Sequence, residues 1–114
     1  MLHLPEFNCR VVAVAEPDEV KRKMAVESWR IPPENVFEDA EAFFRRPKFC
    51  DALVNTTQDA LHVSTALAAI AHAYPMLLEK PMAVTPGDCR AIADAACRAG
   101  TVLTVCHSLR YHAT

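Results

Sequence analysis

The stretch from Met76 to Asp88, M-L-L-E-K-P-M-A-V-T-P-G-D, decides the fold class of this 114-residue chain. Its first three residues form an apolar run that predicts a short buried strand. Two charged residues and a proline follow where that strand ends. Thr85 is then a good N-cap, Pro86 suits the first helical position, and a carboxylate three residues after the cap is typical of a capping box. The stretch therefore predicts a strand, a polar turn and a helix in direct succession.

The same alternation continues on both sides of this stretch. Downstream, we expect the helix to end at Gly100 and a last strand to cover 101–106. Upstream, a strand at 51–56 precedes a helix from Gln58 to about Ala73, for which Thr57 is the expected cap. Each helix has an apolar stripe at steps of three and four residues, which predicts one buried face. The predicted buried positions are Ala60, Val63, Leu67, Ile70 and Tyr74 in one helix and Cys89, Ile92, Ala96 and Ala99 in the other.

The first third of the chain shows the pattern in shorter segments. The Val/Ala run at 10–16 lacks polar alternation, which is typical of a strand covered on both faces. Pro17 is the expected first residue of a helix that Ile31-Pro32-Pro33 ends. A short strand near 36–37 and a short helix capped by Asp39 follow. The order predicts an α/β fold, with a doubly wound parallel sheet, right-handed crossovers and helices on both faces.

Composition and charge exclude several classes of protein. The chain is 52% hydrophobic and 23% charged, and its net charge of −2 offers no basic field for a nucleic-acid backbone. Its five cysteines include no C-x-x-C pair and no zinc-site spacing, so we expect no metal. We find neither a secretory leader nor an apolar run long enough to span a membrane. We therefore expect a cytoplasmic protein without membrane contact.

Polar side chains follow the expected strands at their carboxyl ends, where ligands bind in parallel sheets. Glu16 ends the first strand, Thr57 lies just beyond the third, Glu79-Lys80 end the fourth, and Arg110 follows the fifth. A polar residue at one strand end is commonly a solubility feature. Their joint occurrence indicates a ligand site.

With these residues the chain resembles the Gfo/Idh/MocA family, the glucose-fructose oxidoreductase and inositol dehydrogenase-like enzymes that use NAD(P) on a Rossmann domain. The resemblance is carried by V-V-A-V-A-E-P-D at 11–18, T-T-Q-D-A-L-H at 56–62, L-L-E-K-P-M-A at 77–83 and V-C-H-S-L-R-Y at 105–111. It covers nearly the whole chain. It implies a Rossmann-like fold with NAD as cofactor and NADP as the alternative.

The resemblance also implies roles for individual residues. Glu16 would accept hydrogen bonds from the adenosine ribose and repel a 2′-phosphate, which favours NAD, although Arg10, Lys21 and Arg22 are close enough in sequence to leave NADP open. Lys80 resembles the family's active-site lysine, which contacts substrate and the nicotinamide region. The other implied cofactor-binding residues are Thr57, His62, Glu79 and Arg110, the last with Tyr111 beside it.

Plainer interpretations of these residues remain open. Glu79 and Lys80 are also consistent with a solvated surface pair, and His62 with a half-buried packing residue. Gln58 stands where the family more often has proline. Cys106-His107 has neither an acid partner placed by sequence nor metal spacing, so a nucleophile there is the weaker interpretation.

The glycine-rich turn that grips the pyrophosphate in such domains does not occur in the sequence, because the only glycines, Gly87 and Gly100, flank the last helix. We therefore expect residues 1–114 to be one partial NAD(P)-binding domain that lacks the first βα unit and the substrate domain. Such a chain would be marginally stable by itself and expose strand edges.

Three functional interpretations follow. In the first, the chain is the NAD(P)-binding portion of an oxidoreductase that transfers hydride to or from a sugar, polyol or related alcohol, inactive alone and part of a homo-oligomer when complete. In the second, it is a non-enzymatic truncated isoform that binds or regulates a full-length subunit. In the third, the 10–16 strand pairs directly with the 51–56 strand in a small reassembled module.

Overall fold

The computed structural model describes residues 8–111, in which strands and helices alternate as the sequence predicts. Residues 1–7 and 112–114 lie outside this range. The chain divides into a first unit, Met1–Arg46, and a second unit, Pro47–Thr114. The described strands form two separate sheets, one with the order β1-β2 and one with the order β3-β4-β5. The third interpretation concerns the 10–16 and 51–56 segments, which belong to different units, and it stays a prediction.

The sheet of the first unit has two short parallel strands. β1 (Val14–Ala15) pairs with β2 (Val36–Phe37) in the register Val14 to Val36 and Ala15 to Phe37. The expected strand at 10–16 is therefore shorter than predicted, and Ala15 is exposed rather than covered. The 3-10 turn Pro33–Asn35 and the Asp39 cap of α2 (Ala40–Phe44) confine β2 to two residues, which limits the ladder with β1.

Helix α1 (Glu19–Trp29) begins two residues later than predicted, because Asp18 is its N-cap and Pro17 lies before the cap. The Asp18 carboxylate accepts hydrogen bonds from the Val20 and Lys21 backbone N–H groups, and these bonds hold the pKa of Asp18 below its usual value. The helix ends at Arg30, which adopts a left-handed conformation with φ 52° and donates its N–H to the Val26 carbonyl. The helix thus ends just before the Ile31-Pro32-Pro33 segment, as predicted.

A small aromatic cluster forms the core of the first unit. Ile31, Phe37 and Phe43 are buried, and the Phe37 and Phe43 rings meet edge to face with their centroids 5.3 Å apart. Arg46 lies over the Phe37 ring and donates to the Glu34 carbonyl and the Asn35 side chain. The predicted Asp39 cap is confirmed, since its carboxylate accepts the Ala42 N–H at 2.7 Å.

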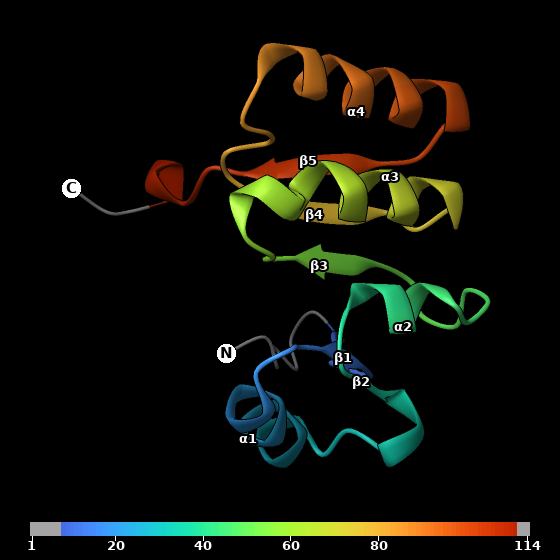
Figure 1. Cartoon of the computed structure of the whole chain (residues 1–114), viewed down its shortest axis with the longest axis vertical. Helices are drawn as coiled ribbons and strands as arrows, with labels where there is room; N and C mark the ends of the chain where they lie inside the picture. The colour runs from blue at the N-terminus through green and yellow to red at the C-terminus, as the bar shows by residue number, and fades with distance from the viewer. Residues whose placement is uncertain (1–7, 112–114) are drawn as a thin grey trace. The chain divides into compact units, whose positions relative to one another are not determined.

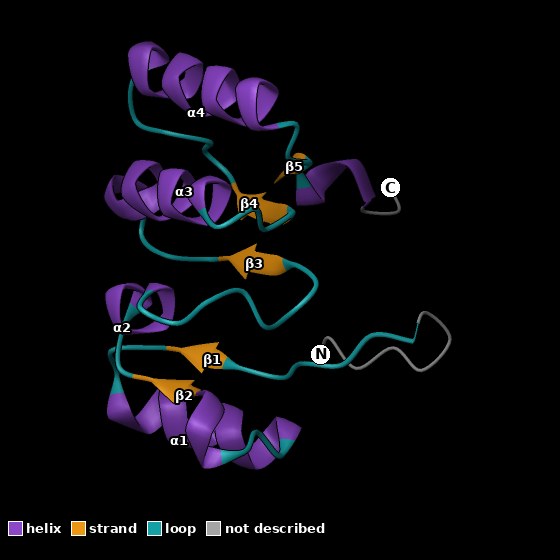
Figure 2. Ribbon diagram, turned by 90° about the vertical axis from the view of Figure 1, so that its right-hand side faces the viewer, coloured by secondary structure: helices purple, strands orange, loops and turns teal. Residues whose placement is uncertain are grey.

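The sheet of the second unit has three parallel strands, β3 (Leu53–Asn55), β4 (Met76–Glu79) and β5 (Leu103–Cys106). Helices α3 (His62–Ala71) and α4 (Pro86–Ala99) connect them and pack against each other (Figures 1 and 2). Sequential strand order with right-handed crossovers places both helices on the same face. The other face carries a cross-strand row of Val54, Leu77 and Thr104, all exposed.

The start and buried face of α3 differ from the prediction. Thr57 is not its cap, because a 3-10 turn at Asp59–Leu61 precedes the helix. The fully or nearly buried residues are His62, Ala66, Ala69 and Ile70, whereas the predicted Ala60 and Leu67 are exposed. The predicted burial is therefore confirmed for Ile70 and wrong for Ala60 and Leu67, and the helix also packs through two alanines and a histidine that the apolar period did not predict. Tyr74, just beyond the helix, is buried as predicted and accepts the Phe49 N–H at 3.0 Å.

Helix α4 begins and ends as the sequence predicts. The Asp88 N–H donates to the Thr85 hydroxyl oxygen at 3.1 Å, and that hydroxyl donates to the Asp88 carboxylate at 2.8 Å. Gly100 ends the helix with φ 62°, a conformation that costs other residues energy. Ile92 and Ala96 are buried and Cys89 is half-buried, but the predicted Ala99 is exposed because it lies in the last turn.

Substitution of the Thr85 cap provides a stability test of this fold. Thr85→Ala should lower the free energy of unfolding by about 1 kcal/mol, because the Asp88 N–H loses its side-chain acceptor. Thr85→Ser keeps that oxygen and should retain most of the stability. Urea midpoints of the three chains measure the effect, and equal midpoints for the alanine and serine variants would contradict the capping role.

Candidate functional site

The carboxyl ends of β3, β4 and β5 lie along one edge of the second unit's sheet, because the three strands are parallel (Figure 1). Asn55 is paired with Leu78, and Glu79 with Cys106, so the segments that follow the strands start side by side. Thr57, Glu79 and Lys80 belong to these segments. The sheet therefore brings them to a common edge, as the sequence predicts.

Asn55, the last residue of β3, organises the turn that follows. Its side chain is 8% exposed and donates from Nδ2 to the Thr65 hydroxyl at 2.7 Å. Its Oδ1 accepts both the Thr57 hydroxyl, at 2.9 Å, and the Thr57 backbone N–H, at 3.2 Å. Sequence analysis missed Asn55, although an amide at the end of an apolar run was a signal. The Thr57 side chain is thus oriented by Asn55 instead of capping a helix.

His62 links this turn to the loop after β4. The side chain is fully buried, with Nδ1 2.7 Å from the Pro81 carbonyl oxygen and Nε2 2.9 Å from the Thr57 carbonyl oxygen. Both ring nitrogens are therefore occupied by the protein's own backbone. The expectation that His62 itself contacts a cofactor does not fit this geometry, and neither does a half-buried packing role. The structure makes it a residue that holds two segments of the site together.

Glu79 and Lys80 do not form the surface ion pair that was the plainer interpretation. The Glu79 carboxylate instead accepts the Lys80 backbone N–H, with Oε2 2.6 Å from the nitrogen. Lys80 is exposed, and its amino group has no hydrogen-bond or ion-pair partner among residues 8–111. The Lys80–Pro81 peptide bond is cis. The Lys80 backbone is thus held by the Glu79 side chain, while its amine has no partner among the described residues.

Glu16 lies in the first unit, directly after β1. One carboxylate oxygen accepts the Asp18 N–H at 2.9 Å, and the Glu16 backbone N–H donates to the Phe37 carbonyl at 3.2 Å. Arg22 donates from one guanidinium nitrogen to the Glu16 and Pro17 carbonyl oxygens. Arg22 therefore stabilises the turn that carries the Glu16 carboxylate.

Arg110 and Tyr111 belong to the 3-10 turn Ser108–Tyr111 that follows β5. Both side chains are exposed, and the Arg110 backbone N–H donates to the His107 carbonyl at 3.0 Å. Of the six predicted cofactor residues, Glu16 thus belongs to the first unit and the other five to the second.

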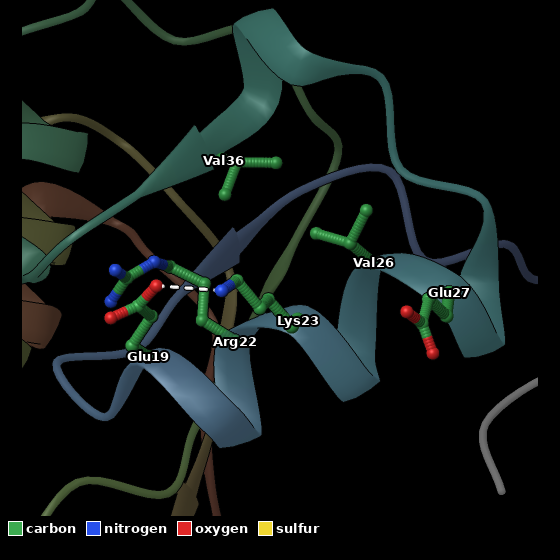
Figure 3. A pocket seen from close by; sticks show the side chains of 6 residues that line it. All are labelled: Glu19, Arg22, Lys23, Val26, Glu27 and Val36. Atoms are coloured by element: carbon green, nitrogen blue, oxygen red, sulfur yellow. Dashed lines mark ion pairs between the residues drawn. The ribbon is translucent and has the colours of Figure 1, made fainter.

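A shallow hollow among the described residues lies elsewhere, beside α1. It has a volume of about 300 Å³ and is open to solvent. Figure 3 shows the ion pair between Glu19 and Lys23, 2.7 Å long, at this hollow, with Val26 and Val36 as its apolar part. None of its lining residues is a predicted site residue, so the hollow is separate from the candidate site.

The described residues contain no group of three or more His, Cys, Asp or Glu side chains arranged to hold a metal ion. None of the helices in residues 8–111 is long and apolar enough to cross a membrane.

Comparison with known proteins identifies the family. Residues 2–107 match the family model of oxidoreductases with an NAD-binding Rossmann fold, the Gfo/Idh/MocA family. Inositol 2-dehydrogenase from Pseudomonas fluorescens Pf-5 is 37% identical over 87 residues, which are 76% of this chain and 25% of that enzyme. A shorter match of 50 residues to the Klebsiella pneumoniae inositol 2-dehydrogenase is 46% identical and covers 44% of this chain and 15% of that enzyme.

Solved structures show the same fold. Aldose-aldose oxidoreductase from Caulobacter crescentus, complexed with glycerol, has a TM-score of 0.80 and 28% identity over 91% of this chain and 31% of its own. An oxidoreductase from Agrobacterium radiobacter, in complex with NAD+, L-tartaric acid and magnesium, has a TM-score of 0.80 and 25% identity over 88% of this chain and 28% of its own. The chain spans about a quarter of the length of the first curated relatives that it matches. With its strand order, strand-end residues and match over residues 2–107, the chain belongs to the Gfo/Idh/MocA family of oxidoreductases with an NAD-binding Rossmann fold.

Proposed function

We propose that this chain is the NAD-binding portion of an oxidoreductase that transfers hydride between the nicotinamide and a sugar, polyol or related alcohol. The observation that carries the proposal is the common edge at which β3, β4 and β5 present Thr57, Glu79 and Lys80. The inositol 2-dehydrogenase relatives support a polyol as the substrate class. In this role the chain binds the cofactor, and hydride transfer takes place in a protein that also binds the substrate.

The residues present fit part of a nicotinamide dinucleotide. A carboxylate after the second strand of such domains accepts the hydroxyls of the adenosine ribose. Glu16 fits this role, because only one of its carboxylate oxygens accepts a hydrogen bond from the described residues. Its negative charge disfavours a 2′-phosphate, and Arg22 is engaged with backbone carbonyls of the same turn. We therefore favour NAD over NADP.

The pyrophosphate is the part that these residues do not fit. Dinucleotide domains grip it with a glycine-rich turn that lets the backbone approach closely. The only glycines of this chain, Gly87 and Gly100, lie at the two ends of α4. We therefore assign this chain the ribose and nicotinamide sides of the cofactor.

Lys80 is the residue to which we assign chemistry. When bound, the nicotinamide ring supplies the acceptor or donor of hydride. An exposed amine at the end of β4 can donate a hydrogen bond to the oxygen of the reacting alcohol or carbonyl and move its proton. The Glu79 carboxylate accepts the Lys80 backbone N–H and so holds the backbone from which the lysine side chain extends.

The second candidate is a non-enzymatic chain that binds a full-length subunit of the same family. The exposed apolar residues Val54 and Leu77 on the open face of the second unit's sheet favour it, being 52% and 37% exposed. Tight association with a full-length relative in analytical ultracentrifugation, without NAD-dependent changes in the chain, would support this candidate over the first.

An NAD titration tests the first candidate. Millimolar NAD added to the labelled chain should shift the backbone amide signals near Glu16, Thr57 and Lys80. Glu16→Gln should weaken NAD binding roughly tenfold, because a charged hydrogen bond to the ribose contributes about 1.5 kcal/mol or more. Glu38→Gln, a change of an exposed carboxylate just after β2, is the matched control and should leave affinity unaltered. Signals that do not move with NAD would contradict the proposal.

Lys80 can be tested separately in a catalytically active protein that contains this sequence. Lys80→Ala should lower kcat far more than it lowers NAD affinity, because the amine acts on the reacting oxygen rather than on the dinucleotide. Lys80→Arg keeps the charge but is a poor proton donor, so it should recover binding without recovering turnover. Unchanged turnover in the alanine variant would remove Lys80 from the chemistry.

A further inference from the structure

His62 has hydrogen-bonding surroundings that a neutral histidine cannot satisfy. The side chain is fully buried, and each ring nitrogen lies at hydrogen-bond distance from a backbone carbonyl oxygen: 2.7 Å from Nδ1 to Pro81 and 2.9 Å from Nε2 to Thr57. Carbonyl oxygens only accept hydrogen bonds. A neutral imidazole carries one N–H and one lone pair, so one of its nitrogens would direct a lone pair at an oxygen.

The doubly protonated ring removes this conflict. An imidazolium donates from both nitrogens, and hydrogen bonds from a charged donor are stronger than neutral ones. Burial opposes the charge, whereas the two carbonyl dipoles that point at the ring favour it. The charged side chains on the segments that hold the ring are Asp59, Glu79 and Lys80, and none of them is a hydrogen-bond or ion-pair partner of the ring.

The two acceptors belong to the segments that carry the candidate site. Thr57 lies in the turn after β3, and Pro81 directly follows Lys80 in the loop after β4. The ladder between β3 and β4 ends at the pair Asn55 and Leu78, so it does not connect these two segments. A side chain that donates to both carbonyls does connect them. Asn55 and Thr65 hold the side chain of Thr57, but His62 alone among the described residues bonds both segments through its side chain.

We propose that His62 is a positioning residue held with a proton on both ring nitrogens, and that it makes the turn after β3 and the Lys80 loop move as one body. The consequence of this tie for catalysis rests on the proposed function. The tie itself does not, because it is made entirely within the second unit. Failure of NAD binding and failure of the tie are therefore distinguishable.

The ring nitrogens can be observed directly in the unmodified chain. Long-range proton–nitrogen NMR spectra of the chain labelled in its histidines should show, near neutral pH, one residue with slowly exchanging N–H groups on both nitrogens. His62→Gln should remove this pair of signals and thereby assign it. A buried ring that merely fills space would show a single N–H and one bare nitrogen, which would overturn the proposal. Signals of His62 that coincide with those of the exposed His107 would overturn it as well.

Backbone amide signals test the coupling of the two segments. His62→Gln should shift the Thr57 and Lys80 amides together and increase their hydrogen exchange by similar factors. His72→Gln is the matched control, because the His72 ring bonds the Ala68 carbonyl within its own helix, at 2.8 Å. That variant should leave both amides in place. A response of only one segment to His62→Gln would contradict the tie.

Discussion

The hydrogen bonds of the buried His62 side chain are the interaction on which the candidate site depends. Parallel pairing aligns β3 and β4 only as far as the end of each strand, and the segments beyond need their own connections. The imidazole supplies one by reaching both the Thr57 and the Pro81 carbonyl oxygens from the first turn of α3. A buried polar side chain, rather than apolar packing, thus holds the backbone of these two segments in position.

Element types could be predicted from the sequence because local signals for strands, caps and stops agree along most of the chain. The Thr85 cap and the Gly100 stop are examples, since each acts through the backbone of its own helix. The phase of α3 could not be predicted in this way. Its buried face uses Ala66, Ala69 and His62, whose position depends on neighbours far along the chain rather than on the apolar period. The same holds for Asn55, whose partners Thr57 and Thr65 become neighbours only after the turn has formed.

Among the candidate site residues, the structure gives two side chains hydrogen-bond partners that the sequence motifs did not predict. Thr57 was expected to cap a helix, and it bonds Asn55 instead. His62 was expected to touch the cofactor, and it bonds the backbone on either side. Both differences have one physical origin. A motif indicates that a residue at a strand end is important for the site. The burial and hydrogen-bond partners of that residue decide whether its side chain faces the ligand or holds a neighbouring residue in place.

The direction of α3 and α4 has an electrostatic consequence for the second unit. Each helix follows a strand through a loop at the carboxyl edge of the sheet, so its first turn lies on the side of Thr57 and Lys80. The unpaired N–H groups of a first turn carry a partial positive charge of about half an elementary charge. Two such helix ends and the Lys80 amine share this edge with the carboxylates of Asp59, Glu79 and Asp88, so the edge carries charges of both signs. A ligand at the strand ends therefore meets partners of both signs, although the chain as a whole has a net charge of −2.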